Sequence, residues 1–164
     1  MEVLYELGFN WENILGWDWI PAVLGCAVLI VVRPLFKYDA RKLFVLLRSC
    51  AGIAGTALIL LSVYSVVSDV KDYSDMKKAL ENGQALEVEG YVENYHPMPR
   101  EGHDTERFDI SGVHFEYSNF ILSQGYNLPA SYGGVIHGNG QHLLIRYVSG
   151  SGGSNTILYI AELE

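Results

Sequence analysis

LFVLLRSCAGIAGTALILLSVYSVV, residues Leu43 to Val67, decides the fold class of this chain. Its one charged residue, Arg48, lies close enough to the start for its long stem to reach the lipid headgroups. The stretch exceeds the roughly 20 apolar residues that a helix needs to cross a bilayer. It predicts a transmembrane helix at about 43–67, in which Gly52 and Gly55 belong to a small-residue face suited to helix packing. The alternative is a buried hairpin of a soluble protein, but such a helix needs a polar face.

A second apolar run precedes this one. Residues 20–32 read IPAVLGCAVLIVV, and Trp11, Trp17 and Trp19 come just before or at its start. Tryptophan is enriched where a helix meets the lipid–water interface. We therefore expect a first span at about 16–36, after an N-terminal tail at 1–15, so that residues 16–68 form a transmembrane hairpin.

The charges around the two runs predict an orientation. The connector 33–42 holds four basic residues, whereas the segment before the first span holds four acidic residues and no Lys or Arg. Basic short loops stay in the cytoplasm. In a bacterial inner (plasma) membrane the connector would be cytoplasmic, and both termini, with the C-terminal domain, would be periplasmic.

Charge is distributed unevenly along the 164 residues. Residues 1–68 carry five basic and five acidic residues, and residues 69–164 carry six basic and 14 acidic residues, so the formal net charge of −8 comes from the C-terminal part. An acidic domain gains little from counterion release on a phosphate backbone, which argues against nucleic acid as a partner.

Residues 69–84 read as a short connecting helix with Ser74 as its N-cap and Gly83 as its stop. Residues 85–164 then show period-two alternation, expected as strands at 85–95, 107–110, 113–117, 141–148 and 156–163. The order of these strands, with a long glycine-bent first strand, predicts a five-stranded OB-like β-barrel with a short helix. A different small antiparallel sheet or sandwich is the alternative.

Polar residues on the outward face of this predicted sheet are the candidate site. Asp109 and Glu116 flank a tight turn at 111–112 and could act as an acid–base pair, and His114 lies on the same predicted face. Cross-strand ion pairs with Arg107 and Arg146 account for the same residues equally well. Aromatic residues such as Tyr91 could stack on a sugar or a partner, or belong to the barrel core or rim. The weak binding candidates are Tyr91, Arg107, Asp109, His114, Glu116 and Arg146.

Chemical motifs are otherwise missing from the sequence. It has no GxSxG, no GxGxxG and no phosphate-binding loop, and the cluster around His103 and Asp104 matches no local metal-binding spacing. We therefore expect no catalytic residue, no metal and no cofactor.

Four segments form a recognisable pattern: VEGYVENYHPMPREGHDTERFDISGVHFEYSNF (88–120), GYNLPASYGG (125–134), LLIRYV (143–148) and ILYIAELE (157–164). The pattern resembles the C-terminal domain of an uncharacterised family of small bacterial membrane proteins. The arrangement of helices before an OB-like barrel is similar to that of NfeD-like proteins. The resemblance implies a fold and no particular activity. Within it Gly112-Val113, Tyr117-Ser118 and 125–127 are expected to determine turns.

These features predict a non-enzymatic, membrane-anchored binding or assembly module. Its partners would be the lipid bilayer and either a second copy of the chain or another membrane protein. An immunity or signalling protein that neutralises or senses a cationic partner is the alternative. A lipid- or glycan-acting enzyme that uses Asp109, His114 or Glu116 is a further one.

Overall fold

A computed structural model describes residues 1–9, 16–35, 42–102, 104–120, 124–150 and 153–164, with the backbone alone at 34–35 and 42–48. The chain divides into two compact units. Residues 14–71 form the helical unit, and residues 1–13 together with 72–164 form the β unit.

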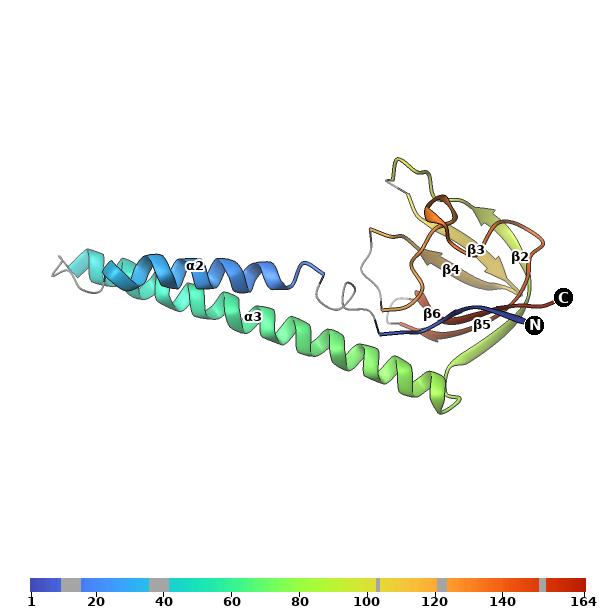
Figure 1. Cartoon of the computed structure of the whole chain (residues 1–164), viewed down its shortest axis with the longest axis horizontal. Helices are drawn as coiled ribbons and strands as arrows, with labels where there is room; N and C mark the ends of the chain where they lie inside the picture. The colour runs from blue at the N-terminus through green and yellow to red at the C-terminus, as the bar shows by residue number, and fades with distance from the viewer. Residues whose placement is uncertain (10–15, 36–41, 103, 121–123, 151–152) are drawn as a thin grey trace. The chain divides into compact units, whose positions relative to one another are not determined.

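In the helical unit, α2 (Trp19–Leu35) runs alongside the first part of α3 (Lys42–Glu81), as Figure 1 shows. The two helices meet at glycines: a Cβ on Gly25 would lie 2.5 Å from the carbonyl oxygen of Gly55. At the start of α2, the Ser65 hydroxyl donates to Asp18 Oδ1 at 2.8 Å, and the Ser62 hydroxyl donates to the Asp18 carbonyl. Close backbone approach therefore joins the pair near its middle, and polar contacts join it at one end.

Helix α3 continues without a break to Glu81, so the separate connecting helix expected at 69–84 is the last part of α3. No glycine or proline occurs between Gly55 and Gly83, so nothing in the sequence ends the helix earlier. Gly83, two residues beyond the end of α3, has a φ of 66°, and the Gln84 N–H then donates to the Ala79 carbonyl. A left-handed glycine of this kind commonly ends a helix.

By length and composition alone, α3 between Ser49 and Glu81 is the one helix among the described residues that could cross a membrane. Only 11% of its most apolar window is buried, whereas the core helix of a soluble protein would be mostly buried. Helix α2 has 17 residues and counts only as a shorter apolar helix.

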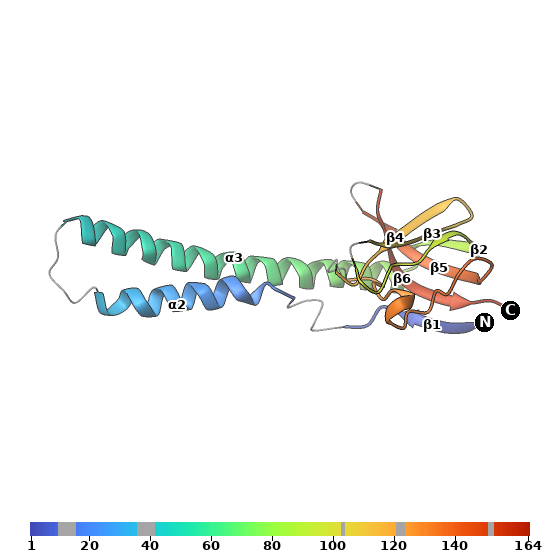
Figure 2. The same cartoon turned by 90° about the horizontal axis from the view of Figure 1, so that it is seen from above.

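The β unit is built on one antiparallel sheet with the strand order β1-β6-β5-β2-β3-β4. Its strands are β1 (Glu2–Glu6), β2 (Leu86–His96), β3 (Glu106–Ile110), β4 (Val113–Tyr117), β5 (His142–Ser149) and β6 (Asn155–Glu162). One turn of 3₁₀-helix, η1 (Ala130–Tyr132), lies in the long connection between β4 and β5. Figures 1 and 2 show that β2 passes from the half of the sheet containing β5 and β6 to the half containing β3 and β4.

Curling of the sheet encloses a single core. Phe115 on β4 meets Tyr147 on β5 edge to face, with ring centroids 5.2 Å apart. Gly90 lets the sheet curl at β2, because a Cβ there would lie 3.2 Å from Ile110 Cγ2 and would clash with the Ser111 hydroxyl. The buried core side chains are Val92, Phe108, Ile110, Phe115, Tyr117, Tyr126, Ile136, Leu143, Ile145, Tyr147, Ile157 and Ile160.

Two expectations about this domain need correction. The sheet has six strands rather than five, because residues 2–6, expected to be part of a tail, pair with β6. The sheet is also not closed into a barrel. Closure would need a free edge on β6, but β1 pairs with β6. The Leu7 N–H also donates to the Leu158 carbonyl, and the Tyr126 N–H donates to the Ile157 carbonyl. The Asn155 side chain on β6 reaches β4, where it donates to the His114 carbonyl at 2.9 Å.

Candidate functional site

Strands β3 and β4 present a polar face outward because their side chains alternate. Along β3, Phe108 and Ile110 are buried, whereas Arg107 and Asp109 are partly exposed. On β4, the exposed His114 and Glu116 lie directly opposite Asp109 and Arg107. The structure thus brings four of the six predicted binding candidates onto one face of one hairpin.

The centre of this face is a carboxylate–imidazole pair. His114 Nδ1 lies 2.7 Å from Asp109 Oδ1, and the Asn94 amide donates to Asp109 Oδ2 at 2.8 Å. Hydrogen bonds from Asn94 and His114 hold the pKa of the Asp109 carboxyl below its usual range. The other ring nitrogen, His114 Nε2, lies 4.0 Å from Glu116 Oε2. His114 therefore stands between two carboxyl groups.

A second pair continues the face towards the β2–β3 connection. Asp104 Oδ2 lies 2.8 Å from His96 Nε2, and Arg107 donates to Asp104 Oδ1 at 3.1 Å. Hydrogen bonds from His96 and from the Thr105 N–H, together with the Arg107 charge, lower the pKa of Asp104 to about 2. The Thr105 hydroxyl donates to Glu116 at 2.6 Å, which links the two pairs.

We call this set the carboxylate–histidine row; its members are Asn94, His96, Asp104, Thr105, Arg107, Asp109, His114 and Glu116. Its hydrogen bonds fix side-chain positions on β2, on the β2–β3 connection and on the β3–β4 hairpin. Arg107 is its only permanent cation against three acidic side chains. The row therefore presents oriented carboxyl oxygens to solvent.

The remaining two candidates lie on the outer face of β2 and β5. Tyr91 stacks on His142, its partner in the strand register, with ring centroids 4.5 Å apart. Arg146 donates to Glu87 at 2.8 Å and lies over the Tyr159 ring, 5.2 Å from its centroid. The ion-pair interpretation joined Arg146 to Asp109 or Glu116, whereas the structure pairs it across strands with Glu87.

A buried carboxyl group lies on the opposite side of β3. Glu106 has no exposed surface; Tyr117 donates its hydroxyl to Oε1 at 2.6 Å, and the Ala130 N–H donates to Oε2 at 2.9 Å. Burial and the contact with Glu106 raise the pKa of Tyr117 far above its usual range. Glu106 thus anchors the β4–β5 connection, including η1, to the inside of the sheet.

Among the described residues, the side-chain contacts of His114 are with the carboxyl groups of Asp109 and Glu116. The Thr105 hydroxyl donates to Glu116, and no serine, threonine or cysteine within the described ranges donates to His114. No group of three or more His, Cys, Asp or Glu side chains in the described part of the chain is arranged to hold a metal ion. Both members of the central pair are open to solvent on a strand surface.

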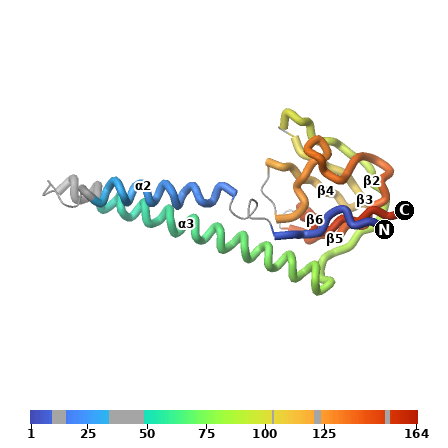
Figure 3. The backbone as a smooth tube through the Cα atoms, viewed as in Figure 1, coloured from blue at the N-terminus to red at the C-terminus, as the bar shows by residue number. Residues whose placement is uncertain are grey.

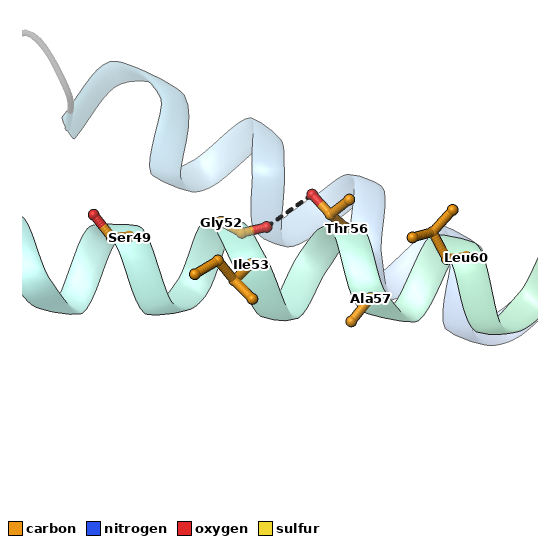
Figure 4. Close-up of a pocket in the computed structure, with 6 residues that line it drawn as sticks. All are labelled: Ser49, Gly52, Ile53, Thr56, Ala57 and Leu60. Atoms are coloured by element: carbon orange, nitrogen blue, oxygen red, sulfur yellow. Dashed lines mark hydrogen bonds between the residues drawn. The ribbon is translucent and has the colours of Figure 1, made fainter.

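The two glycines predicted to pack helices have different surroundings. Gly55 is buried against α2, where a Cβ would lie 3.1 Å from Leu29. A Cβ on Gly52 would meet nothing within 4 Å. Gly52 lines a shallow groove on one face of α3 with Ser49, Ile53, Thr56, Ala57 and Leu60, and the Thr56 hydroxyl donates to the Gly52 carbonyl at 2.9 Å (Figure 4).

Sequence reasoning missed Asn94 and Glu106. Asn94 has a φ of 52° and lies at an irregularity in the β2–β3 register, which turns its amide towards Asp109. A polar asparagine near the end of the expected strand 85–95 is the only signal it left. Glu106 lay just outside the expected strand 107–110, although one more step of the alternation would have made it an inward-facing acid.

No protein-family model, curated protein or solved structure is significantly similar to this chain.

Proposed function

We propose that this protein is a membrane-anchored binding module whose β unit offers the carboxylate–histidine row to a positively charged partner. The helical hairpin is the anchor and has both helices in the bilayer. The β unit is an OB-like domain, partly opened by β1, on the side of the membrane opposite the basic connector 33–42.

The two-span proposal rests on the pairing of β1 with β6. β1 comes before both helices and β2 follows both, yet β1 pairs with β6 in the sheet that contains β2. If α3 crosses the bilayer, the chain between β1 and α3 must cross it in the other direction. Helix α2 lies in that interval, and at about 1.5 Å per residue its 17 residues span about 26 Å, close to a hydrocarbon core. Exposed Trp17 and Trp19 at its start suit the lipid–water interface.

Loop charge supports the orientation. Arg33, Lys37, Arg41 and Lys42 lie in the short connector between the helices, and such a loop is retained in the cytoplasm. In a bacterial inner membrane the β unit would then be periplasmic.

The binding proposal rests on charge and rigidity. Residues 69–164 hold the whole net charge of −8, and on the β3–β4 face the acidic side chains are fixed by hydrogen bonds. Pre-positioned charges of one sign increase the rate of encounter with a partner of the opposite sign and reject partners of the same sign. A cationic protein segment is the partner class that this face suits, as in an immunity or sensing role.

Oligo-lysine immobilised on a surface tests the charged face. The triple variant Asp104→Asn, Asp109→Asn, Glu116→Gln of the full chain in detergent should elute at lower salt than the unaltered protein. A matched control removes three exposed charges elsewhere, through Glu2→Gln, Glu101→Gln and Glu164→Gln. Equal elution of the two triple variants would show that net charge, rather than the row, determines binding.

A further inference from the structure

The acidic β unit contains one long uncharged segment. Residues 117–145 include no Asp, Glu, Lys or Arg, although residues 69–164 carry 20 such side chains in all. Within this segment three large apolar side chains point to solvent: Phe120 is 65% exposed, Leu128 41% and Tyr132 40%. We call these three residues the apolar rim.

Contacts with the β2–β3 connection bring the rim together. The Phe120 ring packs against Gly102, where a Cβ would lie 2.8 Å from Cε2. Two residues away, the Arg100 carbonyl accepts a hydrogen bond from the Tyr132 hydroxyl at 2.9 Å. Leu128 directly precedes Pro129, whose carbonyl accepts the Tyr132 N–H. The rim is therefore one surface, fixed by backbone contacts.

The segment that carries the rim is anchored at the end of the β unit where the chain enters from α3. Its Tyr126 N–H donates to the Ile157 carbonyl, and the Leu7 N–H donates to the next carbonyl, that of Leu158. Two residues after Leu7, the Phe9 ring contacts Tyr73 on α3, with centroids 5.2 Å apart. Figure 3 shows the tube of β1 lying beside the strands labelled β5 and β6 in the β unit.

Few residues separate this part of the chain from the proposed membrane-spanning part of α3. Asp18 accepts the Ser65 hydroxyl at the start of α2, which places a charged side chain, and hence the edge of the hydrocarbon, near Ser65. Tyr73 follows Ser65 by eight residues of continuous helix, a rise of about 12 Å. The headgroup region on each side of a bilayer is several ångströms deep.

We propose that the apolar rim contacts the bilayer surface and inserts at headgroup level, an inference that rests on the proposed anchoring by α3. The acidic remainder of the β unit is repelled by anionic lipid headgroups, whereas the uncharged segment is not. Aromatic side chains suit the interface between headgroups and acyl chains. The contact would hold the β unit in one orientation, with its remaining faces, including the charged row, turned towards partners.

Site-directed spin labelling of the full chain tests this proposal. The protein, with Cys26 and Cys50 replaced by alanine, is reconstituted in vesicles of phosphatidylcholine with a minority of phosphatidylglycerol. A nitroxide is attached at one position at a time: at Phe120, at Tyr91 as an aromatic control of similar exposure (59%), and at Val63 (56% exposed) within α3. The collision rates of each label with oxygen and with a water-soluble nickel complex report its depth. Leu128 is a second rim position if a label at 120 prevents folding.

The proposal predicts a deep label at 63, a label at headgroup depth at 120 and an aqueous label at 91. The oxygen-to-nickel ratio at 120 would then be several-fold higher than at 91. A deep label at 63, with equal oxygen-to-nickel ratios typical of water at 120 and 91, would overturn the rim contact but not the anchoring. The rim would then be a surface for a soluble partner. A membrane-depth ratio at 91 equal to that at 120 would also overturn it, because the contact would not be localised. An aqueous label at 63 would overturn the anchoring itself.

Discussion

Removing the Glu106 carboxyl should destabilise the β unit more than any surface substitution. Glu106→Ala deletes the acceptor of the Tyr117 hydroxyl and of the Ala130 N–H, and Tyr117 is itself only 6% exposed. A buried donor left without its acceptor costs about 1–3 kcal/mol. With two such donors and the cavity left by the side chain, we expect a loss of about 3–5 kcal/mol in the free energy of unfolding.

Tyr117→Phe provides the comparison, because it removes one of the two hydrogen bonds and leaves the ring in the core. We expect it to cost about 1–2 kcal/mol. Urea unfolding of the full chain in a non-ionic detergent, followed by near-ultraviolet circular dichroism of the tyrosines, measures both variants and the double variant. Hydrogen exchange at the Ala130 amide reports the loop contact separately, and its protection should fall in Glu106→Ala.

A double-mutant cycle of Glu106→Ala and Tyr117→Phe can refute the proposed coupling between these two side chains. Side chains that share a hydrogen bond should couple, so the double variant should be more stable than the two single losses would give by addition. Additivity within about 0.5 kcal/mol would mean that Glu106 and Tyr117 act independently. Unchanged protection of the Ala130 amide would show that Glu106 does not anchor η1.

Three further predictions concern separate contacts. Gly134→Ala should destabilise the β unit by about 2 kcal/mol or more in the same urea assay, because its Cβ would overlap a loop carbonyl; a change within 0.5 kcal/mol would be inconsistent with that contact. Gly55→Leu should separate α2 from α3 and so reduce cross-linking between the two helices, whereas Gly52→Leu should leave the hairpin intact. Equal effects of the two substitutions on cross-linking would contradict the different surroundings of the two glycines. Asp104, whose pKa is about 2, should contribute stability above pH 4 that is lost as the pH falls towards 2, and His96→Ala should raise that pKa towards 3.9 in a carbon-13 NMR titration; an unmoved titration would exclude the hydrogen bond as the cause.

Local patterns predicted the elements that depend on local physics. The uncharged run ending at Val67 predicted an apolar helix, and alternation predicted β2 to β6 to within a few residues. The same alternation placed Asp109 and His114 on one outward face. Because each of these predictions depends on neighbours in sequence or on one hairpin, no distant contact had to be known.

Non-local pairing accounts for what was missed. β1 has five residues and a partner at the far end of the chain, and its sequence contains no signal of that pairing. Without β1, the edge of β6 would be free for β4, so a closed barrel was a reasonable expectation. The role of Asn94 depends on a backbone irregularity, and that of Glu106 on a loop that returns inside the sheet. Neither contact could be read from spacing.

Labelling of single cysteines in intact bacterial cells with a membrane-impermeant reagent tests the central claim most directly. Positions 2, 39 and 127 are used in a background that lacks Cys26 and Cys50. Two crossings predict that positions 2 and 127 react, while position 39, in the basic connector, reacts only after lysis. Reaction at 127 with protection at both 2 and 39 would mean a single crossing, which the pairing of β1 with β6 does not allow, and reaction at 39 alone would reverse the orientation.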